Sequence, residues 1–581
     1  MLDINDKKIE WFKKAKFGLF IHWGLYAVTE GYWNGEKDSG IVEWIAAHKR
    51  IPNSDYERLA EKMTCEKFNP DYIAALAADA GMKYCVFTAK HHDGFAMFDT
   101  KYDDYSIVKK SPYGKDVTAE LTAAMRRRGI VPCLYYSQAL DFHEKNAMGN
   151  TWDNDIPEEK RDFVSYINGK CKFQLKEILE NYGDIGLIWM DVPKGMTAEL
   201  AEDLKSYIKG IQPGCLVSGR IGGGEDMGDY GCLGDNQIPA GELKGCWETA
   251  ATMNDTWGYK SFDHNFKSPK ELIELLCGLV SKGANLLLNI GPDAKGEIPA
   301  ESVGILKEIG KWMSINGEAI YGTEASAFKA DFSFGTACKK ENILYLFVYN
   351  TAEKISLNGI ESKAEKVSLL GYGELEFKQG EALEISLKNV PENKYVNVVK
   401  VAFNESVKVR SGLYSQESGK IILPAYCGEI KKRGGFERAA EILGDAATKG
   451  EKFNTYSENE ISINAAGIIE NWFSEKDGVS WSFYADNDGE YDAVLYTLSQ
   501  KYIQWKGGHT VHFECNGVSE SKTLTADFTT VGANKKYFDE TGSFIGKLTV
   551  KKGKNILKLI ADRINPEDLG GLCISKIILS R

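Results

Sequence analysis

The first 325 or so residues alternate short apolar runs with amphipathic helical stretches, and no other feature of the chain restricts its fold as much. Strands that alternate with helices predict a parallel sheet with the helices outside it. Seven or eight such units over about 300 residues favour a closed (β/α)8-like TIM barrel over an open doubly wound sheet. Seven strands are predicted, at 17–24, 83–95, 130–137, 186–191, 214–220, 245–253 and 285–292, with helices between them at 70–81, 117–129 and 160–183.

The helical pattern ends after the predicted barrel (1–325), and short strands with polar turns follow it. Residues 326–405 contain three such strands, which predict a small β-sandwich. Residues 406–581 alternate apolar and polar positions at the strand period. This pattern predicts a second β-sandwich of jelly-roll type, appended to the others and similar to a carbohydrate-binding module. Its three tryptophans either stack on sugar rings or fill its core: Trp472, Trp481 and Trp505.

Composition and charge exclude several classes of partner. The net charge of −12 argues against nucleic acid, because phosphate binding requires a basic patch. No stretch approaches the roughly 20 apolar residues of a membrane span, so no membrane partner is expected. The first 16 residues lack the apolar core of a secretory signal, and the 12 cysteines form no CxxC pair. Reduced thiols of this kind predict a cytoplasmic protein, and a homo-oligomer is left open.

Polar and aromatic side chains gather at the predicted strand ends. The apolar run Leu187–Met190 is followed by Asp191, which indicates a buried strand with a charged tip. In a parallel barrel, the carboxyl ends of the strands form the catalytic face. Consecutive strand ends and loops with such groups predict a binding cleft rather than isolated core residues. The other groups are His22, Glu43, Trp44, His91, His92, Tyr135, Tyr136 and Arg220.

Two chemistries can use this set of side chains. In a metal site, His22, His91, His92 and Asp191 would be the ligands. In a sugar site, the imidazoles and Arg220 would bind hydroxyl groups, while aromatic rings cover the apolar face of the sugar. Adjacent His91 and His92 are expected to diverge, because successive side chains of a strand alternate between its faces. There is also no HxH or HExxH motif, so the sugar site is favoured.

The barrel half resembles glycoside hydrolase family 29, the retaining α-L-fucosidases, in segments that follow the family's order. These segments are WFKKAKFGLFIHWG, EW at 43–44, KYCVFTAKHHDGF, YYS, IWMD, GDY, WET with TWGY, and NLLLNIGPDAKGEIP. The likeness spans nearly the whole barrel, and the sandwich to about residue 405 also fits. It implies an exo-α-L-fucosidase that acts on fucosylated oligosaccharides or glycoconjugates, without a cofactor or a metal.

The resemblance also implies a role for each matching residue. Asp191 matches the nucleophile of the family. A retaining glycosidase needs a second carboxylate, about 5–5.5 Å from the first, to protonate the leaving oxygen. The positions that match the lining of the fucose pocket are His22, Glu43, Trp44, His91, His92, Tyr136, Trp189, Arg220 and Trp257.

The second carboxylate, the acid/base, is the least regular feature of this family. The stretch GDYGCLGDNQIP at 228–239 corresponds to the place where several members carry it, so Asp235 is the predicted acid/base. Many members have Glu at that point, and an Asp reaches one methylene less far. Glu248 is the second choice, either as the acid or as a partner behind the site. The remaining downstream carboxylates are Glu225 and Glu242.

Two alternatives from other classes remain open. A fucose-binding protein without catalytic activity could share the barrel, but the presence of both Asp191 and a downstream carboxylate argues against it. A metal-dependent barrel hydrolase would lose its activity on exhaustive chelation. The linkage that is cleaved depends on loops around the leaving group, and the sequence does not give it.

Overall fold

The computed structural model describes residues 9–222, 227–243, 245–350, 353–388, 390, 394–410, 412, 415–417, 420–431, 461–464, 466–475, 477–501, 505–530, 538–568 and 570–581. Glu225, one of the alternative acids, lies outside these residues. The chain divides into two compact units, and the barrel half forms the first of them. The second unit comprises Asn236–Leu243, Cys277–Gly283 and Thr323–Arg581.

The first unit is built on an eight-stranded parallel sheet. Its strands are β1 (Phe17–Ile21), β4 (Tyr84–Lys90), β5 (Val131–Tyr136), β6 (Leu187–Met190), β7 (Leu216–Val217), β8 (Gly231–Cys232), β9 (Trp247–Ala251) and β10 (Asn285–Ile290). They pair in the order β7-β6-β5-β4-β1-β10-β9-β8, which is the order of the chain around a ring. A parallel bridge between Ser218 and Tyr230 joins the end of β7 to the start of β8. The sheet therefore closes as the predicted TIM barrel.

Burial explains why the strands are visible in the sequence. Every residue of β1, β4, β6 and β10 is buried. A parallel sheet that is covered on both faces requires such continuous apolar runs. Strand β8 is absent from the seven predicted strands, because Gly231 and Cys232 form no apolar run, whereas the equally short β7 consists of Leu216 and Val217.

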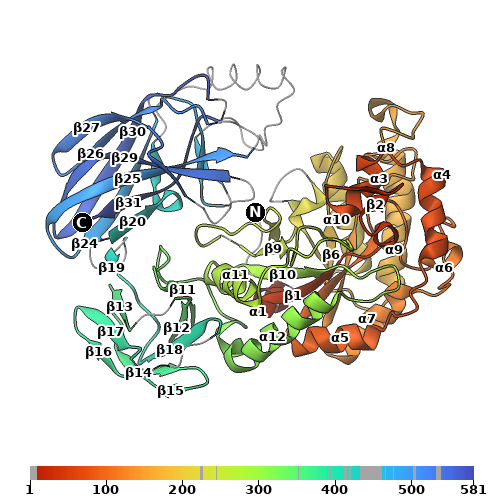
Figure 1. Cartoon of the computed structure of the whole chain (residues 1–581), viewed down its shortest axis with the longest axis horizontal. Coiled ribbons are helices and arrows are strands. Elements are labelled where there is room, and N and C mark those ends of the chain that lie inside the picture. Colours follow the sequence, from red (N-terminus) through yellow and green to blue (C-terminus); the bar gives the residue numbers. More distant parts are fainter. Residues whose placement is uncertain are drawn as a thin grey trace. The chain divides into compact units, whose positions relative to one another are not determined.

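Helices cover the outside of the barrel (Figure 1). The longer ones are α5 (Pro70–Asp79), α7 (Val117–Arg127), α9 (Lys172–Asn181), α10 (Ala198–Ile211), α11 (Pro269–Ser281) and α12 (Ala300–Asn316). Asn69 and Asp116 cap the first turns of α5 and α7, because their side chains accept backbone N–H bonds there. The predicted helix at 160–183 is divided by a π-helical turn, Ile167–Cys171, between α8 (Phe163–Tyr166) and α9.

The second unit contains two groups of antiparallel sheets with separate cores. The first group pairs β11 (Gly335–Lys340), β12 (Ile343–Val348), β18 (Asn397–Phe403), β14 (Ala364–Leu369) and β15 (Gly373–Glu374) in one sheet, and β13 (Lys354–Asn358), β17 (Ala382–Ser386) and β16 (Phe377–Gln379) in another. These strands form the small β-sandwich that the sequence predicts after the barrel. The boundaries proposed at residues 325 and 405 stay predictions.

The second group forms the larger sandwich. One sheet has β19 (Ser415–Glu417), β20 (Lys420–Pro424), β31 (Leu572–Ser580), β25 (Gly489–Gln500), β29 (Phe538–Val550) and β28 (Phe528–Thr530), and the other has β21 (Glu429–Lys431), β24 (Gly478–Ala485), β30 (Gly553–Arg563), β26 (Thr510–Cys515) and β27 (Val518–Thr523). Trp472 and Trp481 are both 0% exposed in its core, and Trp505 packs against that core. Trp472 and Trp481 are therefore core residues and not sugar-stacking platforms.

The segment that follows Asp235 belongs to the second unit. The N–H of Ala240 donates to Ala466 O at 2.8 Å. Gly241 faces the ring of Tyr426, where a Cβ would lie only 2.2 Å from a ring atom. The larger sandwich therefore holds the stretch Asn236–Leu243, although this stretch lies between two barrel strands in the sequence.

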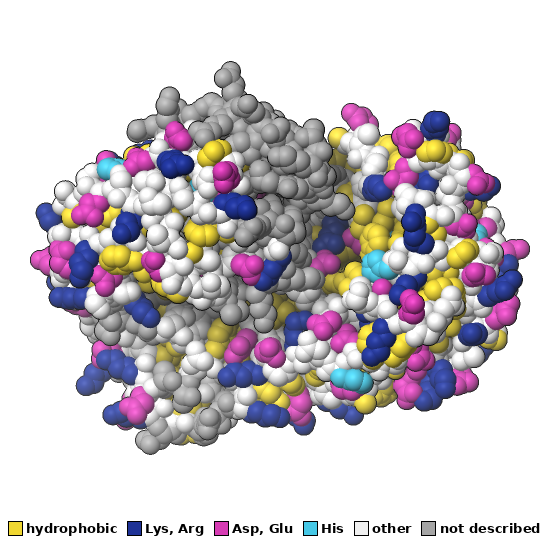
Figure 2. Space-filling view, turned by 45° about the horizontal axis from the view of Figure 1, so that its top comes forward, with side chains coloured by type: hydrophobic (Ala, Val, Ile, Leu, Met, Phe, Trp, Pro, Cys, Tyr) yellow, Lys and Arg dark blue, Asp and Glu magenta, His cyan; other side chains and the backbone are white. Residues whose placement is uncertain are grey.

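Charged side chains of both signs are mixed on the surface. On the face drawn in Figure 2, lysine and arginine side chains are interspersed with aspartate and glutamate over the described residues. None of the helices in the described chain has the length and the apolar character that crossing a membrane requires.

Candidate active site

The predicted site residues lie at the carboxyl ends of the barrel strands. His22 follows β1, His91 and His92 follow β4, and Asp191 follows β6. Arg220 lies in a short 3₁₀ turn after β7, and Asp235 lies shortly after β8. Because all these strands are parallel, their ends meet at one rim of the barrel.

Arg220 binds both of the predicted catalytic carboxylates. Its Nη1 lies 3.0 Å from Asp191 Oδ1, and its Nη2 lies 2.6 Å from Asp235 Oδ1. Nη2 also donates to Leu233 O at 2.9 Å. The two carboxylates are therefore separated by no more than one guanidinium group and its hydrogen bonds. Such a bridge brings both acids within range of a single sugar ring.

The Asp191 carboxylate is fixed by further donors. Tyr135 Oη donates to Oδ2 at 3.0 Å, and the N–H of Val192 donates to Oδ1 at 3.0 Å. Burial raises the pKa of Asp191, whereas the Arg220 guanidinium lowers it. Val192 has a φ of 42°, which is unusual for a β-branched residue. A strained backbone therefore supplies one of the bonds that orient this carboxylate.

Gln138 is a site residue that the sequence analysis misses. Its Oε1 accepts the N–H of Asp191 at 2.9 Å, and its Nε2 donates to Arg220 O at 2.9 Å. The side chain is fully buried. Gln138 thus fixes the backbone at both ends of the Asp191–Arg220 pair. A polar residue directly after a predicted strand is the only signal that the sequence offers for it.

His22 has a defined tautomer, because Asn289 in β10 orients it. Asn289 Nδ2 donates to Trp257 O at 2.7 Å, which turns Asn289 Oδ1 toward His22 Nδ1, also at 2.7 Å. Nδ1 of His22 therefore carries the hydrogen, and Nε2 is an acceptor. Burial lowers the pKa of His22 to about 4, so the ring is neutral at pH 7. Asn289 is a second residue that the sequence analysis misses.

His92 is fixed in the same way. Ser137 Oγ donates to Leu140 O at 2.8 Å and therefore accepts from His92 Nδ1 at 2.7 Å. Burial and the neighbouring Lys90 lower the pKa of His92 to about 3. Its Nε2 is thus an unprotonated acceptor that lies 3.7 Å from Asp191 Oδ2. A hydroxyl hydrogen between these two acceptors would relieve their repulsion.

The expected divergence of His91 and His92 is wrong. Their ring centroids lie 4.2 Å apart. Strand β4 ends at Lys90, so both histidines lie beyond it and the alternation of strand faces does not apply. His91 stacks on Tyr135 at 5.1 Å, and its buried Nδ1 has no hydrogen-bond partner among the described residues.

The prediction that Tyr136 lines the pocket is also wrong. Tyr136 Oη donates to Gln174 Oε1 on α9 at 2.9 Å, and the Lys90 ammonium lies 4.6 Å from its ring. The preceding residue, Tyr135, reaches Asp191 instead. The reason is the period of two in β5, which turns consecutive tyrosines to opposite faces of the sheet.

Glu43 lies in the 3₁₀ turn Val42–Trp44 and is buried. Its Oε2 accepts the N–H of Gly258 at 3.3 Å, and its Oε1 has no hydrogen-bond partner within the described chain. Burial raises the pKa of Glu43 to about 7, and the charge of Asp235 adds to this effect. A buried oxygen without a partner is the kind of group that a ligand hydroxyl satisfies.

Two indole rings flank the imidazoles. The Trp44 ring lies 4.8 Å from the His92 ring, and the Trp257 ring lies 4.9 Å from the His22 ring. Trp257 is 6% exposed, whereas Trp44 is partly exposed. The site therefore combines hydrogen-bonding groups with apolar walls, as a sugar requires.

The other candidate acids lie elsewhere. Glu248 is 1% exposed in the barrel interior, where it accepts from Tyr84 Oη at 2.5 Å and from Trp189 Nε1 at 2.8 Å. The Glu242 side chain is 57% exposed and lies 3.8 Å from the Lys329 ammonium. Of the described alternatives, Asp235 alone shares the Arg220 guanidinium with Asp191.

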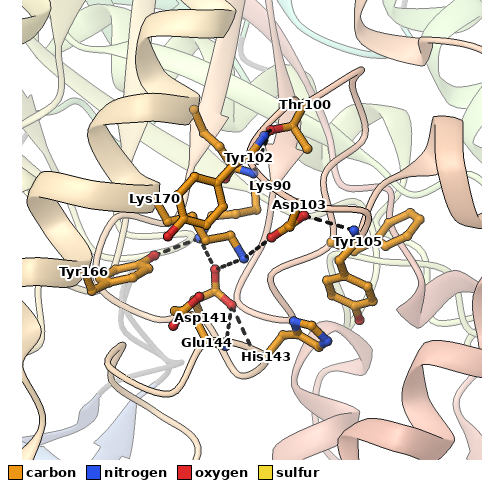
Figure 3. Close-up of polar contacts among 12 residues, drawn as sticks. Lys90, Thr100, Tyr102, Asp103, Tyr105, Asp141, His143, Glu144, Tyr166 and Lys170 are labelled. Atoms are coloured by element: carbon orange, nitrogen blue, oxygen red, sulfur yellow. Dashed lines mark hydrogen bonds and ion pairs between the residues drawn. The ribbon is translucent and has the colours of Figure 1, made fainter.

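Lys90, Asp141, Tyr166 and Lys170 form a buried cluster with ion pairs at its centre (Figure 3). Asp141 Oδ2 accepts from the Lys90 ammonium at 3.1 Å and lies 3.0 Å from the Lys170 ammonium. Lys90 also donates to Tyr166 Oη at 3.1 Å. The π-helical turn Ile167–Cys171 carries Lys170 into this cluster. Because Lys90 directly precedes the two histidines, the cluster anchors the start of their loop.

The described residues include no group of three or more His, Cys, Asp or Glu side chains that could hold a metal ion. The alternative metal site would use four side chains as ligands: His22, His91, His92 and Asp191. In the structure these side chains make the contacts given above.

The sequence profile of the α-L-fucosidase family matches residues 3–318. Plasma alpha-L-fucosidase of Homo sapiens is 30% identical over 392 residues, which cover 63% of this chain and 82% of that protein. Alpha-L-fucosidase of Dictyostelium discoideum is 30% identical over 347 residues, covering 55% of this chain and 73% of its own.

A solved structure is similar over both units. The crystal structure of an alpha-L-fucosidase from Vibrio sp. strain EJY3 has a TM-score of 0.83 and 27% identity, and the match covers 100% of this chain and 99% of that one. The likeness thus includes the C-terminal sandwiches as well as the barrel. Fold, profile and relatives agree that the protein is a glycoside hydrolase. More specifically, the chain belongs to the α-L-fucosidase family.

Proposed function

We propose that the protein is a retaining exo-α-L-fucosidase, with Asp191 as the nucleophile and Asp235 as the acid/base. The observation that carries this proposal is the Arg220 guanidinium, which binds both carboxylates and so holds two acids side by side at the catalytic rim. A double displacement needs two acids about 5–5.5 Å apart. An α-L-fucosidase of Bacteroides thetaiotaomicron has been trapped as a covalent intermediate. Its structure is similar to that of this chain, with a TM-score of 0.63 and 26% identity.

In the first step, an Asp191 oxygen forms a bond to the anomeric carbon while the bond to the glycosidic oxygen breaks. Asp235 gives its proton to that leaving oxygen. In the second step, Asp235 takes a proton from water, whose oxygen attacks the same carbon and releases Asp191. The Arg220–Asp235 contact has to open so that Asp235 can reach the glycosidic oxygen.

The substrate class follows from the neutral acceptors of the site. The Nε2 atoms of His22 and His92 accept from sugar hydroxyls, and Glu43 Oε1 offers a further partner. Trp257 supplies an apolar wall for the methyl group of fucose. Fucosylated oligosaccharides or glycoconjugates fit these features. With none of its 12 cysteines in a disulfide, the protein suits a reducing compartment, and we propose the cytoplasm.

Replacing Asp235 with alanine separates this acid from its rivals. Hydrolysis of unactivated fucosides should fall by about 10²–10⁴, because their leaving oxygen needs a proton. An aryl fucoside with a good leaving group should keep its first step, and added azide should give α-L-fucosyl azide with retention. Initial rates on both substrates and the anomeric configuration of the azide measure this.

Glu242→Ala is the matched control, because Glu242 also lies downstream of Asp191, its side chain is exposed and it pairs only weakly with Lys329. It should retain wild-type rates on both substrates. If Glu242→Ala shows the leaving-group dependence and Asp235→Ala does not, the assignment of Asp235 is wrong.

The pocket should discriminate against a hydroxyl group on C6. An aryl α-L-galactoside differs from the aryl α-L-fucoside only by this hydroxyl, which would be desolvated against Trp257 without a partner. We expect kcat/KM to fall by about tenfold to a hundredfold, the equivalent of roughly 1–3 kcal/mol. Equal kcat/KM values for the two glycosides would contradict the pocket proposed here.

A further inference from the structure

Glu248 is a carboxyl group in the interior of the barrel. It lies in β9 and is 1% exposed among apolar side chains of the strands. Burial raises the pKa of Glu248 to about 7, while the bonds from Tyr84 and Trp189 and the charge of Arg220 oppose this rise. Burying a carboxyl group is costly, and an apolar residue would fill the same space more cheaply. Its presence therefore requires an explanation.

Glu248 lies near the start of its strand, away from the rim that carries the two aspartates. In the parallel register of β9 and β10, Glu248 pairs with Asn285 at the start of β10. Asn289, which orients His22, lies four residues farther along the same strand. Four residues of a strand correspond to about 13 Å. Glu248 therefore lies well below the rim that carries the two aspartates.

The indole of Trp189 connects Glu248 to that rim. Its Nε1 donates to Glu248 Oε1 at 2.8 Å. The indole contacts two residues near the rim. Arg220 Cζ lies 4.7 Å from the Trp189 ring centroid. The Tyr135 ring stacks on the indole, with the two ring centroids 5.6 Å apart. Arg220 and Tyr135 both bind the Asp191 carboxylate.

We propose that Glu248 is a positioning residue of the reaction: it fixes the Trp189 indole through Nε1, and the indole in turn aligns Arg220 and Tyr135 on Asp191. This inference rests on the proposed function. It assigns Glu248 no proton transfer to the substrate, and so it separates Glu248 from the acid/base role of Asp235.

Three single variants test the role. Glu248→Leu removes the acceptor of the indole, so kcat on an aryl fucoside should fall by about tenfold to a hundredfold, with KM nearly unchanged, because the misplaced groups act in the transition state. Glu248→Gln keeps an oxygen acceptor and should recover kcat to within about threefold of wild type. Tyr84→Phe is the matched control, because it removes the other hydrogen bond to Glu248 but leaves the indole bond intact.

Each variant has an outcome that overturns the proposal. An acid/base residue could not be rescued by glutamine, so equal losses in Glu248→Gln and Glu248→Leu would overturn it. An equal loss of kcat in Tyr84→Phe and Glu248→Leu would show that Glu248 only stabilises the barrel. Thermal midpoints of all variants are measured in parallel.

If Glu248→Leu does not fold, Trp189→Phe tests the same contact from the other side. Phenylalanine offers Arg220 a ring but has no N–H for Glu248. The kcat of the Trp189→Phe variant should fall, and adding Glu248→Gln to it should cause no further loss. An unchanged kcat in Trp189→Phe, or additive losses in the double variant, would overturn the proposal.

Two measurements separate this inference from the proposed function. The wild-type rate on aryl fucoside tests the function itself. The indole N–H resonance of Trp189, in protein labelled with ¹⁵N-tryptophan and assigned with Trp189→Phe, reports the contact without turnover. It should shift in Glu248→Leu, or in Glu248→Gln if the leucine variant is unfolded, and stay in place in Tyr84→Phe. An unchanged resonance in the Glu248 variant would overturn the proposed contact.

Discussion

Replacing Asp191 with glycine is expected to lower the turnover of every α-L-fucoside by several orders of magnitude, whatever the leaving group. The variant lacks the oxygen that bonds to the anomeric carbon, so both activated and natural substrates lose the covalent step. Added azide should restore part of the activity, because the anion fits the space that the carboxylate leaves. Its attack from the nucleophile side should give the inverted product, β-L-fucosyl azide.

Asp191→Asn is the matched control for this experiment. Its amide keeps the volume of the carboxylate and an acceptor for the Tyr135 hydroxyl, but it leaves no space for azide. It should be as inactive as Asp191→Gly and should not respond to azide. Circular dichroism of both variants checks the fold. Near-native turnover of Asp191→Gly would refute the double-displacement mechanism proposed here.

Replacing Asp141 with asparagine should cause a large loss of stability in the barrel. Asp141 is 0% exposed and faces the Lys90 and Lys170 ammonium groups, which are 0% and 1% exposed. The variant leaves both cations without this carboxylate in a dry interior. Breaking a buried pair in this way costs about 3–5 kcal/mol of unfolding free energy. Urea unfolding followed by tryptophan fluorescence reports on the barrel, which holds nine of the 12 tryptophans.

Asp103→Asn is the control for Asp141→Asn. The Asp103 side chain is 27% exposed and lies 3.3 Å from the same Lys170 ammonium. Because water screens it, its loss should cost no more than about 1 kcal/mol. Equal destabilisation by Asp103→Asn and Asp141→Asn would contradict the assignment of a dry cluster.

The pH dependence of the Asp141→Asn effect has a defined sign. Burial opposes ionisation of Asp141, but Lys170 and Lys90 outweigh it and hold the pKa of Asp141 below its ordinary range. A carboxyl group with a lowered folded-state pKa stabilises the fold above its unfolded pKa, near 4, and loses this effect as the pH falls through the folded value. The difference between wild type and variant should therefore stay constant from about pH 5 to 7 and shrink only in acid.

The sequence predicts the barrel because its buried strands appear in the chain as continuous apolar runs. Strands covered on both faces need uninterrupted apolar runs, and a polar residue directly after such a run lies at the rim. Leu187–Met190 with Asp191 is an example, and the structure places Asp191 at that rim. Strand β8 is not visible in this way, because its two residues, Gly231 and Cys232, form no apolar run.

The contacts of the site depend on side-chain direction, which residue types do not reveal. Tyr135 and Tyr136 are the same residue type at adjacent positions, yet only Tyr135 reaches Asp191. The reason is the face of β5 from which each extends. His91 and His92 converge because β4 ends one residue before them, and a boundary of this kind is not visible in an apolar run.

The barrel, the sandwiches and the rim on which Asp191 lies can be predicted from the amino-acid sequence, because each follows from a local pattern of apolar and polar residues. Which carboxylates share a site depends on the folded arrangement of the strands. Asp235 and Glu248 both follow Asp191 at comparable distances along the chain, but Asp235 meets Arg220 at the rim while Glu248 pairs with Asn285 deep in the barrel. Their depth depends on strand register and on the closure of the sheet, and both are set by contacts between residues far apart in the chain.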